Sequence, residues 1–142
     1  MYSLINKINN KQTLNFADIE FILQYTKQHI NDKNVLKQIL EILNEDIKLR
    51  KEKFNIDCFK ELKKERLLFP LRIQYLLEKK SKTKIELIVL KLTAILYNEY
   101  TRLVEEIGDK YIQKQITYEE YENKMKEYDI NFLKLSFLTL LT

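Results

Sequence analysis

Glycine and proline each occur only once among the 142 residues of this chain, as Gly108 and Pro70. Tight β-turns, bulges and phosphate-binding loops depend on glycine for positive φ angles, whereas the interiors of α-helices exclude both residue types. The scarcity of both residues therefore predicts helix along nearly the whole chain. We expect an all-α fold, a single compact bundle of about five to seven helices that spans residues 1–142 as one domain.

Apolar residues recur at three- and four-residue steps, and this pattern divides the first part of the chain into helices. We expect helices over residues 16–30 and 35–54, joined by a turn at 31–34 into an αα-hairpin. A third helix follows Asp57, which can cap it, and a fourth begins at Pro70, because proline fits the first turn of a helix. Asn15 is the predicted N-cap of the 16–30 helix, and Ile30 is its last inward residue.

The longest helix is expected in the middle of the chain, over about residues 84–107. Thr83 and Glu86 have the spacing of a capping box, in which each side chain accepts a hydrogen bond from the backbone of the other residue. Residues 85–97 are apolar on nearly every side, which predicts a position at the centre of the bundle. Gly108 is expected to end or loosen this helix, and Thr117 with Glu120 forms a second capping box that begins the next one.

Composition argues against a membrane protein and against a disordered chain. The sequence is 45% hydrophobic and 32% charged, and no apolar segment reaches the length of about 20 residues that a spanning helix needs. The first residues lack the apolar stretch of a signal peptide, and a single cysteine cannot form an internal disulfide. We therefore expect a cytoplasmic protein that does not contact a membrane.

The inventory of reactive residues argues against an enzyme. One histidine and one cysteine cannot build a Cys/His metal site, which takes about four such ligands, and Gly108 alone cannot build a glycine-rich phosphate loop. His29 is expected at the end of the first predicted helix, and Cys58 is expected to be a small buried hydrophobe. We predict no catalytic activity, no cofactor, no metal and no small-molecule substrate.

Positive charge is concentrated in residues 48–84, which hold 13 Lys or Arg against 5 Asp or Glu. Such a segment can bind a phosphate backbone, and a tyrosine among the cations can stack on a base. It can equally be a solvated, lysine-rich helical face. Glu41, Glu45 and Asp46 on the preceding helix argue against a helix-turn-helix DNA reader. The candidate nucleic-acid contacts are Lys60, Lys63, Lys64, Arg72, Tyr75, Lys79, Lys80, Lys82 and Lys84.

The last segment, residues 130–142, is too densely apolar to be a solvent-facing tail. It can dock on the chain's own bundle, or it can be covered by another subunit or by the rest of a longer protein of which this chain is a fragment. Aromatic residues precede it at helical spacing, and aromatic helix faces are common in protein interfaces. The candidate interface residues are Tyr121, Tyr128, Phe132, Leu133, Phe137 and Leu141.

Two functions follow from these two surfaces. The first is a non-catalytic interaction protein, a small subunit or adaptor that binds a protein partner or self-associates through its C-terminal third. The alternative is a nucleic-acid-binding protein that uses residues 48–84 to contact the phosphate backbone. The first is preferred because the chain lacks a chemical site and carries an apolar C-terminal segment.

Overall fold

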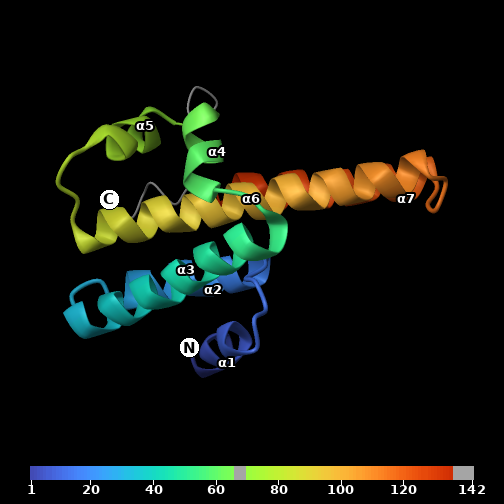
Figure 1. The fold of residues 1–142 in the computed structure, drawn as a ribbon. Helices are drawn as coiled ribbons and strands as arrows, with labels where there is room; N and C mark the ends of the chain where they lie inside the picture. The colour runs from blue at the N-terminus through green and yellow to red at the C-terminus, as the bar shows by residue number, and fades with distance from the viewer. Residues whose placement is uncertain (66–69, 136–142) are drawn as a thin grey trace.

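The computed structural model of the chain describes residues 1–65 and 70–135, and this part forms seven α-helices without a strand (Figure 1). The helices are α1 (Tyr2–Asn9), α2 (Phe16–Gln28), α3 (Lys33–Phe54), α4 (Cys58–Lys64), α5 (Leu71–Glu78), α6 (Lys84–Ile112) and α7 (Tyr118–Leu135). The prediction of an all-α bundle is confirmed.

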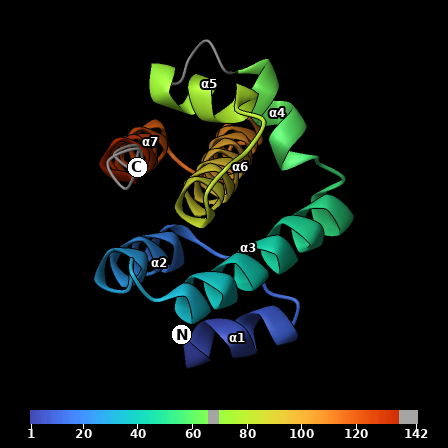
Figure 2. The same ribbon diagram turned by 90° about the vertical axis from the view of Figure 1, so that its left-hand side faces the viewer.

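Helix α6 lies at the centre of the bundle (Figure 2). Helices α2 and α3 pack on one side of it, α4 and α5 on the opposite side, α7 runs alongside, and α1 covers the outer side of α3. The predicted inward residues Ile88, Leu92 and Ile95 of α6 are completely buried. Buried residues of every helix except α4 join them in one hydrophobic core, and the small cluster around Cys58 and Leu62 attaches α4 to α6.

Four helix starts carry the caps that the sequence predicts, and at α4 the Asp57 carboxylate accepts from the Phe59 and Lys60 amides. At α6 the Thr83 hydroxyl accepts from the Glu86 amide, and the Glu86 carboxylate accepts from the Thr83 amide. Asn15 and Asp18 form the equivalent box at α2. At α7 the Glu120 amide donates to the Thr117 hydroxyl at 3.2 Å. These side chains satisfy backbone groups that a helix end leaves without partners, so local sequence sets these boundaries.

Two predictions about individual elements are wrong, and one element was not predicted. Helix α6 continues through Gly108 to Ile112. A single glycine destabilises a helix by only about 1 kcal/mol, and the neighbouring helical turns offset this cost. Ile30 lies beyond the end of α2 and is 40% exposed. Helix α1 was not predicted, yet its Leu4 is buried in the main core.

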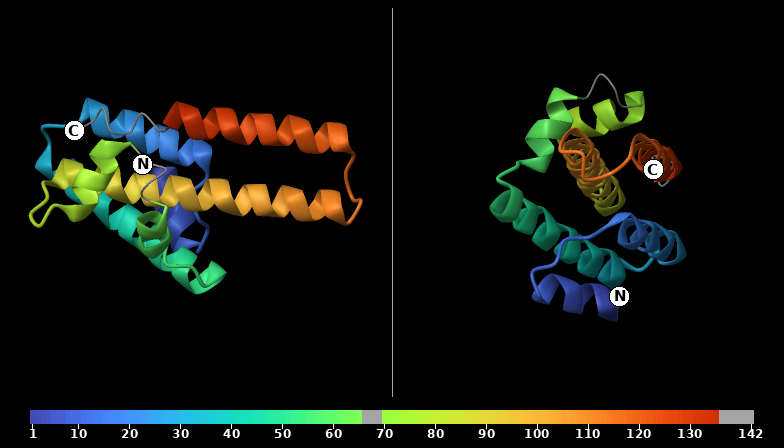
Figure 3. Two further views of the ribbon diagram at one scale, coloured as in Figure 1. Left: turned by 90° about the horizontal axis from the view of Figure 1, so that it is seen from above. Right: turned by 90° about the vertical axis from the view of Figure 1, so that its right-hand side faces the viewer.

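The α6–α7 hairpin is anchored at one end and projects at the other (Figures 1 and 3). Near its base the Tyr100 hydroxyl donates to the Asp129 carboxylate at 2.6 Å, and Lys134 pairs with Glu20 of α2. Leu135 is buried in the main core. The distal halves of both helices extend past the other helices, so the bundle covers the base of the hairpin and leaves its tip in solvent.

No helix within residues 1–65 and 70–135 combines the length and the apolar character that crossing a bilayer requires.

Candidate functional site

Eight of the residues predicted to contact nucleic acid lie on the layer formed by α4, α5 and the loop before α6, and the ninth, Lys84, is the first residue of α6. Lys79 and Lys82 are partly buried, whereas the other seven are exposed to solvent. The exposed residues are Lys60, Lys63, Lys64, Arg72, Tyr75, Lys80 and Lys84. The structure therefore leaves seven of the nine predicted residues accessible and holds Lys79 and Lys82 partly buried.

Part of the positive charge of this layer is neutralised within the chain. The Lys79 ammonium lies 2.8 Å from each Glu86 carboxylate oxygen, and the Arg72 guanidinium lies 3.9 Å from the same carboxylate. The hydrogen bonds from Lys79 and from the Thr83 amide lower the pKa of Glu86 to about 2. Lys79 is thus held by a carboxylate that stays ionised at neutral pH, which weakens its candidacy as a phosphate contact.

The predicted pairing of a cation with an aromatic residue is present on α5. The Arg72 guanidinium carbon lies 5.0 Å from the centre of the Tyr75 ring, and 52% of the Tyr75 surface remains exposed. A cation over a tyrosine ring is attracted by the negative face of the ring. This attraction therefore holds the two side chains together, and part of the Tyr75 ring stays open to a stacking partner.

Four of the six predicted protein-interface residues lie on α7. Phe132 turns inward, where its ring lies 4.5 Å from that of Tyr100 and packs against the main core. Leu133 turns outward and is 62% exposed, while Tyr121 and Tyr128 are partly buried. Phe137 and Leu141 lie outside the described residues. Up to Leu135, then, the apolar C-terminal segment both docks on the chain's own bundle and presents apolar side chains to solvent.

The tip of the α6–α7 hairpin carries an aromatic cluster that the predicted interface includes only in part. The ring of Tyr111 lies 5.0 Å from that of Tyr121 and 5.9 Å from that of Tyr118. Ile112 beside them is 76% exposed, and Tyr118 is 60% exposed. We call Tyr111, Ile112, Tyr118 and Tyr121 the tip cluster. Sequence analysis missed Ile112 because it expected the long helix to end at Gly108.

A buried polar network lies where α3, α6 and the α1–α2 loop meet, and sequence analysis missed it entirely. Arg50 is fully buried and donates to Asp46 at 2.7 Å, to Asn98 at 2.9 Å, to Glu99 at 3.1 Å and to the Leu14 carbonyl. Asp46 was treated as an exposed acid, yet it too is fully buried and accepts from the Leu14 amide. The missed signal is that positions 46 and 50 continue the apolar stripe of α3.

The single histidine and the single cysteine have local roles in the structure. The His29 ring stacks on Tyr25 at 4.2 Å, and its Nδ1 lies 2.9 Å from the Tyr25 carbonyl oxygen. Cys58 is 1% exposed, and burial raises the pKa of its thiol to about 11. No group of three His, Cys, Asp or Glu side chains able to hold a metal ion occurs within the part of the chain that the structure describes.

Comparison with known proteins identified no relative of this chain. No protein-family model matches the chain, and no significant match was found among curated proteins or solved structures.

Proposed function

We propose that this chain is a non-catalytic interaction protein and that the tip of its α6–α7 hairpin docks a partner protein. The observation that carries the proposal is the tip cluster, because it places three tyrosines and a 76% exposed isoleucine on a projecting element. Tyrosine supplies a large contact area with few rotamers to fix, and it is enriched in protein interfaces.

The charge around the tip cluster indicates the kind of partner. Residues 105–127, which form the distal part of the hairpin, hold seven Asp or Glu and four Lys or Arg. Charges that surround an apolar centre steer association toward a surface of opposite sign. We therefore expect a partner surface with an apolar centre and a basic rim.

The test is site-specific photocrosslinking followed by reconstitution. A benzophenone amino acid at Tyr118 should crosslink a partner in native extract, and the same group at Tyr2 of α1, which is 83% exposed, should not. The crosslinked protein is then purified and its affinity for the intact chain is measured. Crosslinks that are the same from both positions would contradict the proposal.

We predict that Ile112→Lys weakens binding of the reconstituted partner by at least about 10-fold, because it removes an apolar contact and repels a basic rim. The free energy of unfolding should change by no more than about 0.5 kcal/mol, since the side chain is exposed and lysine suits the C-terminal turn of a helix. Isothermal titration calorimetry and urea unfolding measure the two quantities. Tyr2→Lys is the control, and equal effects of both variants on binding would refute the role of the tip.

A second candidate function is nucleic-acid binding by the α4–α5 layer, which is favoured by the exposed cations on these helices and at the start of α6. We predict that Lys63→Glu with Lys84→Glu weakens binding of a fluorescent oligonucleotide more than Lys37→Glu does on α3. The slope of log affinity against log salt should also become shallower by about 0.7–0.9 for each phosphate that the variant no longer neutralises. Fluorescence anisotropy with single- and double-stranded DNA and RNA measures both. Absence of binding at low salt would eliminate this function.

A further inference from the structure

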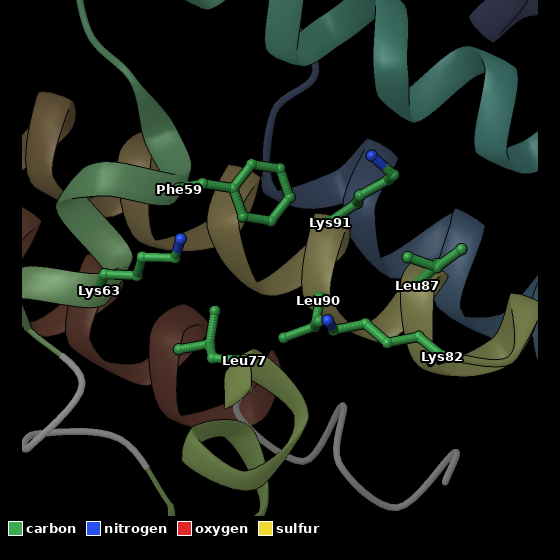
Figure 4. A pocket seen from close by; sticks show the side chains of 7 residues that line it. All are labelled: Phe59, Lys63, Leu77, Lys82, Leu87, Leu90 and Lys91. Carbon is green, nitrogen blue, oxygen red and sulfur yellow. The ribbon is translucent and has the colours of Figure 1, made fainter. Parts of the chain in front are cut away.

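A cavity of about 180 Å³ opens between α4, α5 and α6 (Figure 4). Helices α4 and α5 lie on the opposite side of α6 from α2 and α3 (Figure 2). Its apolar wall comes from three helices, with Phe59 on α4, Leu77 on α5, and Leu87 and Leu90 on α6. Binding pockets for drug-sized ligands occupy about 300–1,000 Å³, so this space suits only a small molecule.

Three lysines complete the lining of the cavity, and each comes from a different segment. Lys63 belongs to α4, Lys82 to the loop before α6, and Lys91 to α6 itself. In the view of Figure 4 the Phe59 ring lies between the side chains of Lys63 and Lys91. We call this site the three-lysine cavity.

No carboxylate of the described residues neutralises these lysines. Lys63 and Lys91 have no acidic side chain within salt-bridge distance in the described part of the chain, and Lys82 donates to the backbone carbonyl of Lys79. The neighbouring carboxylate of Glu86 is already bound by Lys79. The cavity is therefore a region of concentrated positive charge.

The position of Lys91 makes the positive charge of its ammonium group energetically unfavourable. Its ammonium nitrogen lies 5.3 Å from the centre of the Phe59 ring, and partial burial lowers the pKa of the lysine. A ring face compensates a cation less than a carboxylate does. A bound anion would supply an opposite charge that the residues of the lining do not provide.

We propose that the three-lysine cavity binds a small organic anion with an apolar body, such as an aromatic or short-chain carboxylate. The charged group lies among the ammonium groups of Lys63, Lys82 and Lys91, and the apolar body lies against Phe59 and the leucines. The ammonium groups confer selectivity for negative charge, and the apolar wall confers selectivity over inorganic anions. Sequence analysis predicted no small-molecule partner because only the packing of α4 and α5 on α6 brings these lysines together.

Three probes separate the two parts of this recognition. Benzoate carries both the charge and the ring, benzamide carries the ring alone, and acetate carries the charge alone. We predict that benzoate binds saturably, with a dissociation constant at least about 10-fold below those of benzamide and acetate, and that added salt weakens it. Titrations followed by two-dimensional amide NMR measure the constants and locate the shifted resonances. Saturable benzoate binding that shifts the amides of Phe59, Leu90 and Lys91 supports the site.

Matched lysine variants test which ammonium groups contribute to benzoate binding. Lys91→Met and Lys63→Gln should each weaken benzoate binding by at least about 3-fold, because each removes one ammonium from the cavity. Lys60, on the same helix as Lys63, is exposed and does not line the cavity, so Lys60→Gln should leave binding unchanged. Thermal unfolding checks that each variant is folded. If Lys91→Met does not fold, the result with Lys63→Gln decides the test, because Lys63 is exposed and its replacement should not disturb the fold.

Three results would overturn the proposal. Benzamide that binds as tightly as benzoate would show an apolar crevice without anion selectivity. A loss with Lys60→Gln equal to that with Lys63→Gln would show attraction to the whole basic layer. No saturation by benzoate at millimolar concentration would show that the cavity is not a site for this class of ligand.

Discussion

Replacing Arg50 with methionine is expected to lower the free energy of unfolding by about 3–5 kcal/mol, the range measured when one partner of a buried ion pair is removed. Methionine fills a similar length but donates no hydrogen bond. Asp46 and Glu99 would then remain buried, at 0% and 3% exposure, without the guanidinium that they share. The free-energy loss therefore comes from two buried carboxylates that lose their shared guanidinium donor, after which Asp46 keeps only the Leu14 amide and Glu99 keeps only Arg102.

The shape of the guanidinium explains why lysine should not replace it. Arg50 donates through three nitrogens to four acceptors, which belong to α3, α6 and the α1–α2 loop. A single ammonium cannot reach acceptors spread in this way, so Arg50→Lys should recover only part of the stability. The network thus joins three segments that are distant in sequence, and it requires the planar fork of arginine.

Arg102 on α6 provides the matched control for Arg50. It binds the same Glu99 carboxylate at 3.0 Å, but it lies at the surface with 30% of its side chain exposed. Arg102→Met should cost no more than about 1 kcal/mol, as is usual for solvent-screened ion pairs. Urea unfolding followed by circular dichroism measures both variants. Equal losses from Arg50→Met and Arg102→Met would contradict the central role of the buried network.

Sequence could predict the helices because their signals are local. The capping boxes at Asn15 and Thr83 lie within four residues of the ends they define, and the apolar stripes of α3 and α6 repeat within one turn. Gly108 misled the prediction, because glycine ends helices only where the chain adopts a positive φ. The structure places that conformation at Lys114 instead, inside the turn between α6 and α7.

The buried network and the three-lysine cavity could not be predicted, because their residues meet only through packing. Asp46 and Arg50 have the four-residue spacing of an ordinary surface ion pair, and nothing local shows that Asn98 and Glu99 of α6 cover them. The three-lysine cavity has the same origin, since its lysines lie on three segments. Charge density along the sequence indicated a basic region but not which amines lack a carboxylate.

Cys58 is expected to react with iodoacetamide at least about 1,000-fold more slowly in the folded chain than in the unfolded chain at pH 8. Its pKa of about 11, against an ordinary value of 9.0, lowers the reactive thiolate fraction about 100-fold. Its exposure of 1% then requires an opening of the α4–α6 contact before reagent can enter. Mass spectrometry of timed samples, with and without urea, measures the ratio. A ratio below about 10 would show that α4 is not packed as described.

The same thiol should make the stability of the chain depend on alkaline pH. The folded pKa is raised, so the contribution of the protonated thiol to stability is fully present below pH 9 and is lost as the pH rises toward 11. Between pH 8 and 10.5 this loss amounts to about 2 kcal/mol, because each pKa unit corresponds to about 1.4 kcal/mol.

Cys58→Ala isolates this dependence, because both proteins retain every tyrosine and any effect of tyrosine ionisation is the same in both. One of these is Tyr100, where burial and the hydrogen bond to Asp129 raise the pKa to about 12. The variant should be the less stable protein at pH 8, where it lacks a buried side chain, and the difference should shrink or reverse by pH 10.5. Urea unfolding of both proteins across this range measures the difference. Parallel stability curves would mean that the thiol ionises as readily in the folded chain as in the unfolded one, which is incompatible with a buried position between α4 and α6.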